Sequence, residues 1–148
     1  MLIAETDNFK LESHEQAEVS RTDGGHLVIN PKVTANDRTE LSPELAKEMA
    51  LLTQLAGRAM KDGLAERGIK LGRINYQDNG NWRHELHVHL YGRAVDATYH
   101  TYGEPIKAAR TKAEKIIQEP LNQKDCAAIR TKILKYAKAP EYKELHLR

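Results

Sequence analysis

The segment Arg83-His84-Glu85-Leu86-His87-Val88-His89-Leu90-Tyr91 alternates polar and aliphatic side chains over its last seven residues. A β-strand points successive side chains to opposite faces, so this alternation predicts a strand with one polar and one apolar face. The polar face would carry Glu85, His87, His89 and Tyr91. The apolar face would carry Leu86, Val88 and Leu90 and pack on a hydrophobic core. We therefore predict a half-buried strand that aims two imidazoles into a common site.

Two imidazoles beside a carboxyl group suit three kinds of chemistry near neutral pH. The first is a metal site with Glu85, His87 and His89 as ligands. The second is acid–base catalysis by the two histidines. The third is attack of a neutral imidazole on phosphorus, with the other imidazole and nearby amides holding the phosphate oxygens. A zinc-protease helix is excluded, because that motif needs a histidine four residues after His84, where the chain has Val88.

The clearest helix of the chain begins after Ser42. This serine can cap the helix, Pro43 suits its first position, and the negative charge of Glu44 favours the N-terminal dipole. Apolar residues then recur at steps of three and four residues as far as Leu64. We predict that this apolar stripe packs on the aliphatic face of the histidine strand.

Strand-like runs occur on both sides of this helix. They are Phe9–Glu12, Ala17–Val19, His26–Asn30, Ile69–Tyr76 and Arg83–Val95. The last two runs are joined by residues 78–81, where an Asn-Gly pair favours a tight hairpin turn. Helical patterns follow at Ile106–Gln118 and Asn122–Ala137, with Pro120 between them. This order predicts an α+β domain with an antiparallel sheet.

The composition is that of an ordinary globular protein of 148 residues, 30% charged and 40% hydrophobic, which suits a single domain. The formal net charge of +2 gives no basic excess, so we expect no nucleic-acid partner. The densest basic stretch, Lys107–Lys115, is typical of the solvated face of a helix. Cys126 has no other cysteine to pair with, which favours a reducing cytoplasm. We expect no signal peptide and no membrane partner, because no run approaches ~20 apolar residues.

A wider pattern resembles the histidine-triad (HIT) family in order and spacing. Its parts are Gly25-His26-Leu27-Val28-Ile29-Asn30-Pro31-Lys32, the capped helix, Ile74-Asn75, Gly80-Asn81-Trp82, and His87-Val88-His89-Leu90-Tyr91-Gly92-Arg93. The resemblance covers about residues 18–93 and implies an antiparallel sheet of about five strands with a long helix packed on it, followed by C-terminal helices. On this basis we expect a HIT-like domain over residues 1–105 and a C-terminal helical extension of the same domain over residues 106–148.

The family signature is a strand with three alternating histidines, and the middle one attacks the α-phosphate of a nucleotide. Alignment on the residues that follow makes His87 the middle histidine and His89 the last. The first position is Glu85, while His84 is out of register by one residue and would point to the other face. An ionised carboxylate there would repel an incoming phosphate, or it would orient His87 by accepting a hydrogen bond.

The resemblance also implies roles for four residues outside the histidine pair. Asn75 and Asn81 fall where the family places amides near the ribose or phosphate, and His26 matches a histidine beside the phosphate. Glu18 falls where an acidic residue binds the ribose. Trp82 would stack on a base or pack at the edge of the site.

The expected function is therefore that of a nucleotide hydrolase or nucleotidyl transferase acting through a nucleotidyl-histidine intermediate. Dinucleoside polyphosphates and adenylated compounds are the expected substrates. No cofactor would be required, although a divalent metal ion would be able to accompany the nucleotide, and the family resemblance implies a homodimer. Two alternatives remain open: a module that binds or senses a nucleotide without chemistry, and a metal-dependent enzyme that uses Glu85, His87 and His89.

Overall fold

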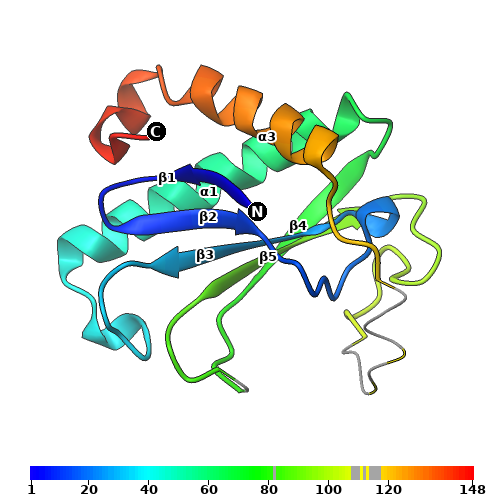
Figure 1. Cartoon of the computed structure of the whole chain (residues 1–148), viewed down its shortest axis with the longest axis horizontal. Coiled ribbons are helices and arrows are strands. Elements are labelled where there is room, and N and C mark those ends of the chain that lie inside the picture. Colours follow the sequence, from blue (N-terminus) through cyan, green and yellow to red (C-terminus); the bar gives the residue numbers. More distant parts are fainter. Residues whose placement is uncertain (82, 108–110, 112, 114–117) are drawn as a thin grey trace.

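The fold is built on a five-stranded antiparallel sheet with the strand order β1-β2-β3-β5-β4 (Figure 1). It is seen in a computed structural model that describes residues 1–81, 83–107, 111, 113 and 118–148. The strands are β1 (Leu2–Glu5), β2 (Phe9–Ser13), β3 (His26–Pro31), β4 (Leu71–Gln77) and β5 (Val88–Ala94). The predicted α+β class and the five-stranded sheet are confirmed.

The long helix α1 (Pro43–Ala65) lies along one face of this sheet (Figure 1). Its start is the predicted one, because the Ser42 hydroxyl accepts a hydrogen bond from the backbone N–H of Leu45 at 3.3 Å. Leu52 and Leu55 of its apolar stripe are fully buried in the same core as Leu90 of β5. No helix in the described part of the chain combines the length and the apolar character needed to cross a membrane.

The helix α3 (Gln123–Tyr136) packs against α1 and also contacts β1 at the edge of the sheet (Figure 1). It begins with a capping box in which Asn122 and Asp125 exchange side-chain-to-backbone hydrogen bonds. The contact with α1 is closest at Gly63, where an added Cβ atom would come within 2.8 Å of the backbone nitrogen of Ile129. The expected helix Ile106–Gln118 and the basic stretch Lys107–Lys115 fall largely outside the described residues.

Three short 3-10 helices complete the secondary structure of the described residues. They are η1 (Arg21–Asp23), η2 (Arg38–Glu40) and η3 (Pro140–Leu145).

Two sequence-based expectations about strands were wrong. The run Ala17–Val19 forms no strand, because the backbone N–H of Glu18 donates to the imidazole of His26 at 3.3 Å and no neighbouring strand pairs with it. The predicted tight hairpin at residues 78–81 is a longer connection, and β5 begins at Val88. The physical reason is that the N–H of Leu86 donates to the carbonyl of Ala35 at 2.9 Å, which takes this segment away from β4.

Candidate functional site

The open face of the sheet, opposite α1, carries the polar side chains of β3 and β5. In the register of these strands, His26 lies opposite Tyr91 and Val28 lies opposite His89. The aliphatic residues of the histidine segment face the core instead, and Leu86, Val88 and Leu90 are each at most 4% exposed. The structure therefore has the predicted separation into an aliphatic and a titratable face.

A close approach of two glycines joins β3 and β5 at this site. An added Cβ atom at Gly92 would come within 2.0 Å of the carbonyl oxygen of Gly24, and one at Gly24 would lie 2.3 Å from the backbone of Gly92. Only glycine fits both positions at this separation. The approach sets the rings of His26 and Tyr91 side by side, with centroids 4.5 Å apart.

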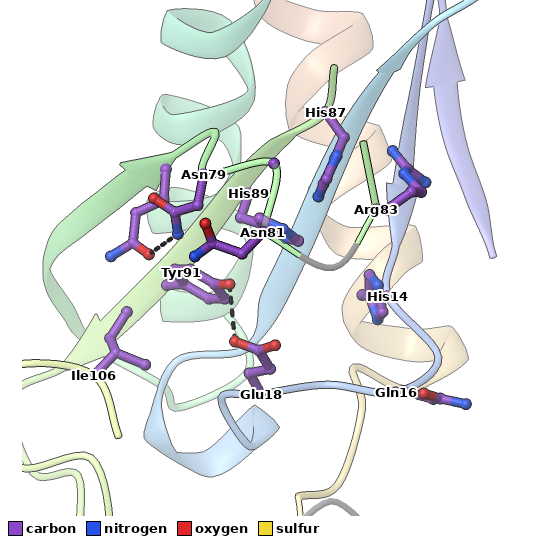
Figure 2. Close-up of a pocket in the computed structure, with 12 residues that line it drawn as sticks. His14, Gln16, Glu18, Asn79, Asn81, Arg83, His87, His89, Tyr91 and Ile106 are labelled. Carbon is purple, nitrogen blue, oxygen red and sulfur yellow. Dashed lines mark hydrogen bonds between the residues drawn. The ribbon is translucent and has the colours of Figure 1, made fainter. Parts of the chain in front are cut away.

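A cavity of about 280 Å³ opens over this face, and we call it the histidine pocket (Figure 2). Its volume is near the lower end of small-molecule sites, which span roughly 300–1,000 Å³. It is lined by His14, Gln16, Glu18, Gln77, Asn79, Gly80, Asn81, Arg83, His87, His89, Tyr91 and Ile106.

His87 presents an unprotonated nitrogen to the pocket when its ring is neutral. Its Nδ1 lies 2.7 Å from the backbone carbonyl oxygen of Glu85. A carbonyl can only accept a hydrogen bond, so Nδ1 carries the proton and the neutral ring keeps a lone pair on Nε2. This is the form of imidazole that acts as a nucleophile.

His89 presents the opposite group to the same pocket. The backbone N–H of Glu18 donates to Nδ1 of His26, so the proton of the neutral His26 ring is on Nε2. That Nε2 lies 2.8 Å from Nδ1 of His89 and donates to it, which leaves the proton of His89 on its own Nε2. His89 is thus a hydrogen-bond donor beside the lone pair of His87, and the two ring centroids are 4.6 Å apart.

His26 and His89 are both held in the neutral form. Burial lowers the pKa of His26 well below its usual value, and the positive charges that His14 and His89 would carry lower it further. Burial, followed by the neighbouring His87, lowers the pKa of His89 to about 4. At neutral pH the arrangement of protons described above for His26 and His89 is therefore the stable one.

His14 is a site residue that the sequence analysis missed. It follows β2, lines the pocket, and stacks on His26 with the ring planes 4° apart and the centroids 4.6 Å apart. Burial also lowers its pKa. The signal in the sequence was the alternation of β2, which puts His14 on the same face as Lys10 and Glu12. Without the pairing of β2 with β3, that alternation does not bring His14 to the distant histidine strand.

The acidic end of the pocket is formed by Glu18 and Tyr91. The phenol of Tyr91 donates to Oε2 of Glu18 at 3.0 Å (Figure 2). Burial raises the pKa of this phenol far above its ordinary value, and the negative charge of Glu18 raises it further. The Glu18 carboxylate therefore accepts one hydrogen bond from the neutral phenol of Tyr91, and its other lone pairs can accept hydrogen bonds from a ligand.

The structure brings some of the predicted site residues together and leaves others out. His87, His89, Glu18 and Asn81 line the pocket, and His26 lies fully buried directly behind His89. Trp82 lies outside the described residues.

Asn75 and Glu85 are not among the lining residues of the histidine pocket. The Asn75 side-chain oxygen instead accepts from Nη1 of Arg93 at 2.6 Å. Glu85 is exposed and lines a neighbouring groove, so it contributes only its backbone carbonyl to His87. Accordingly, Glu85, His87 and His89 do not converge, and no three His, Cys, Asp or Glu residues in the described part of the chain form a metal-binding group.

Solved structures of similar fold come from several prokaryotes. A hypothetical histidine-triad nucleotide-binding protein of Sulfolobus tokodaii strain 7 has a TM-score of 0.63 and 16% identity, and the match covers 95% of this chain and 87% of that one. A histidine-triad protein of Sinorhizobium meliloti 1021 has a TM-score of 0.63 and 17% identity over 91% and 87%. A zinc-bound histidine-triad family protein of Mycobacterium smegmatis has a TM-score of 0.61 and 18% identity over 91% and 86%. At these identities the likeness concerns the fold.

Sequence comparison gives the family directly. No curated protein sequence gives a significant match. The family model of the HIT domain, however, matches residues 16–95, which is more than half of the chain and contains β3, α1, β4 and β5. The chain therefore belongs to the HIT-domain family.

Proposed function

We propose that this protein binds a nucleotide in the histidine pocket and hydrolyses or transfers its nucleotidyl group through His87. One observation carries the proposal: two neighbouring rings present complementary Nε2 atoms to one cavity. His87 offers a lone pair because its Nδ1 donates to the carbonyl of Glu85, and His89 offers a proton because its Nδ1 accepts from His26. A nucleophile beside a fixed donor is the arrangement that attack on a phosphate needs.

The proposed reaction has two steps. In the first, the lone pair of His87 Nε2 forms a bond to the α-phosphorus, and the bond from phosphorus to the leaving group breaks with its electron pair on the leaving group. In the second, water attacks the nucleotidyl-imidazole, the P–N bond breaks, and its electron pair returns to Nε2 with loss of the water's proton to solvent. His89 Nε2–H and the amide of Asn81 hold the phosphate oxygens during both steps.

The acidic end of the pocket suits the sugar of the nucleotide. A ribose offers two neighbouring hydroxyl donors, and the Glu18 carboxylate has acceptor capacity left after its hydrogen bond with Tyr91. This is also the role that the family resemblance gives to Glu18. We therefore propose that the nucleotide lies with its sugar at Glu18 and its α-phosphate between His87 and His89.

The position of Glu85 supports catalysis over binding alone. A carboxylate in the pocket would repel a phosphate, but the Glu85 side chain is exposed and lines the neighbouring groove. The group that does meet His87 is the neutral carbonyl, which places the proton of the neutral ring on Nδ1 and the lone pair on Nε2. A nucleotide-binding module without chemistry is the alternative, and it predicts that the purified protein binds AMP but turns over no nucleotide.

The test is the substitution His87→Asn, assayed on a panel of adenylated and dinucleoside polyphosphate substrates. We expect turnover to fall by at least about 10³-fold, because the nucleophile is lost. Calorimetry with AMP should still show binding, since His89, Glu18 and Asn81 remain. His84→Gln is the matched control, because His84 is exposed and does not line the pocket. Full turnover by the His87→Asn protein would refute the mechanism.

A homodimer remains a prediction of the family resemblance. β4 is at the open edge of the sheet, next to β5, and exposes Tyr76 to 46%. Sedimentation should therefore show a species of about twice the 16.8 kDa chain mass. A single monomeric species at working concentration would contradict this expectation.

A further inference from the structure

A second groove adjoins the histidine pocket on the same face of the sheet. Its volume is about 790 Å³, and its lining includes Lys10 and Glu12 of β2 and Asn30 of β3. Arg83 lines both this groove and the histidine pocket. A ligand that extends beyond the α-phosphate past Arg83 would therefore enter the second groove.

Arg83 is held at this junction by a chain of hydrogen bonds. Its Nη2 donates to the side-chain oxygen of Asn30 at 2.6 Å, and the amide of Asn30 donates to Oε2 of Glu12 at 2.8 Å. Glu12 thus fixes which way the Asn30 amide points, and Asn30 fixes the guanidinium. No carboxylate forms an ion pair with Arg83 in the described part of the chain, so its charge is not neutralised there.

His14 lies near the same charge. Burial is the main cause that lowers the pKa of His14 and of His89, and the positive charge of Arg83 adds a smaller decrease in both. The buried Nδ1 of His14 has no hydrogen-bond partner in the described residues, and its ring lines the pocket. Figure 2 draws His14 and Arg83 on one side of His89, and Tyr91 and Ile106 on the other. A neutral imidazole has only one N–H, and the ring of His14 also has a backbone hydrogen bond with Gln16, so most donors for an anion come from the guanidinium of Arg83.

We propose that Arg83 and His14 form a subsite for a second phosphate, which is the leaving group of the reaction. Resting on the proposed function, this assignment makes phosphoanhydrides the preferred substrates, namely nucleoside polyphosphates and dinucleoside polyphosphates. When the bond between the α-phosphorus and the bridging oxygen breaks, the electron pair stays on that oxygen, and the departing phosphate gains one negative charge. A guanidinium fixed beside this position stabilises the extra negative charge of the transition state more than it stabilises the charge of the bound substrate. An amine or alcohol leaving group accumulates no comparable charge on a neighbouring phosphate and gains little from Arg83.

The first experiment measures binding in the His87→Asn protein, in which turnover does not interfere. AMP and ADP are titrated by calorimetry, because they differ only by the second phosphate. We expect ADP to bind about 10-fold more tightly than AMP, and the additional change Arg83→Gln to remove this difference while altering AMP affinity less than about twofold. Arg73→Gln is the control, because Arg73 is exposed and lines neither the pocket nor the second groove.

Two failures are distinguishable in this experiment. If neither AMP nor ADP binds, the proposed function is wrong and the subsite is wrong with it. If AMP binds and ADP binds no more tightly, or if Arg83→Gln leaves the ADP advantage intact, the proposed function stands and the subsite is overturned.

The second experiment measures kcat/KM with intact His87. Diadenosine triphosphate and adenosine 5′-phosphoramidate deliver the same adenylyl group and differ in the leaving group. We expect Arg83→Gln to lower kcat/KM on the anhydride about 100-fold and on the phosphoramidate less than about threefold, with His14→Gln acting in the same direction by about 10-fold. Asn30→Ala should lower kcat/KM on the anhydride in the same way but by a smaller factor, because Asn30 no longer holds the guanidinium of Arg83 in place. An equal loss on both substrates would overturn the proposal.

Discussion

Two polar regions on the open face of the sheet use their charged groups in opposite ways. One is the histidine pocket. The other, which we call the Arg93 hollow, lies towards the other end of β5 and is lined by Arg73, Asn75, Arg93, Tyr102, Gly103, Glu104 and Pro105. Arg93 is only 5% exposed and donates to the side chain of Asn75 and to the carbonyls of Thr101 and Glu104. The histidine pocket instead keeps the partly buried His89 and the exposed Arg83 with donors left for a ligand.

The difference separates a structural arginine, Arg93, from the arginine for which we propose a role in binding, Arg83. Arg93 uses its donors to fix the loop after β5, and Asp23 fixes the same loop by accepting from the backbone N–H groups of Thr98, Tyr99 and His100. That loop in turn places Ile106 at the wall of the histidine pocket. Arg83 uses one N–H donor, on Nη2, in a hydrogen bond with the neutral amide of Asn30, and its other N–H groups have no such partner among the described residues. A buried arginine that donates to internal acceptors, such as Arg93, stabilises a loop. An exposed arginine with unused donors, such as Arg83, is a candidate for ligand binding.

The largest effect on stability is expected in the Arg93 hollow. Arg93→Met should lower the free energy of unfolding by about 3 kcal/mol, because the side chain of Asn75 and the carbonyls of Thr101 and Glu104 together lose the buried guanidinium that donates to them. Urea unfolding measures this loss. Arg73→Gln, on the exposed rim of the same hollow, should change it by less than about 0.5 kcal/mol. A mild effect of Arg93→Met would remove the contrast between the two regions.

Acid should destabilise the protein through the histidine pocket. The pKa of His89 is about 4 in the folded chain, below its ordinary value of 6.5, and the pKa values of His14 and His26 are also lowered. Between about pH 6.5 and pH 4 the unfolded chain therefore binds protons that the folded chain does not, so stability falls as the pH falls. His89 alone accounts for up to about 3 kcal/mol across this window. Urea unfolding at several pH values should show a shallower slope for His89→Gln.

The proton relay is tested by changing His26, which touches no ligand and acts through His89. His26→Phe removes the donor to Nδ1 of His89, so that ring no longer keeps its proton on Nε2. We expect kcat to fall about 30-fold with KM nearly unchanged. His26→Gln should recover part of the loss, because its amide can accept from the Glu18 N–H and donate to His89. An equal loss in both variants would indicate that His26 matters only for packing.

The smallest effect separates two asparagines that the family resemblance treats alike. Asn81 lines the histidine pocket, whereas Asn75 accepts from Arg93. Asn81→Ala should raise KM about 10-fold, since one phosphate donor is lost. Asn75→Ala should change kcat/KM less than about threefold and instead cost about 1 kcal/mol of stability. The reverse result would place Asn75, not Asn81, at the phosphate.

The sequence predicted the elements whose patterns are local. The Ser42 cap and the apolar stripe of α1 depend on residues within a few turns of one another, and so does the alternation of β5. The strand predicted at Ala17–Val19 was wrong because a long-range contact, the bond from Glu18 to His26, decides its conformation. The same limitation hid His14, whose place in the site depends on the pairing of β2 with β3.

The role predicted for Glu85 shows a second limit. Alternation placed its side chain with the two histidines, but β5 begins only at Val88, so strand geometry does not extend to residue 85. The group that contacts His87 is the backbone carbonyl of Glu85. Because every residue has a backbone carbonyl, the sequence could not indicate this contact. Asn75 was misleading for a related reason, because its competing partner Arg93 lies across the strand pair.

The segment at residue 18 serves both ends of the pocket at once. Its carboxylate meets the phenol of Tyr91, and its backbone N–H meets His26, which in turn meets His89. One residue therefore contributes its side chain to one end of the cavity and its peptide N–H to the tautomer of His26 and His89, so a change that displaces the backbone at Glu18 should disturb both ends.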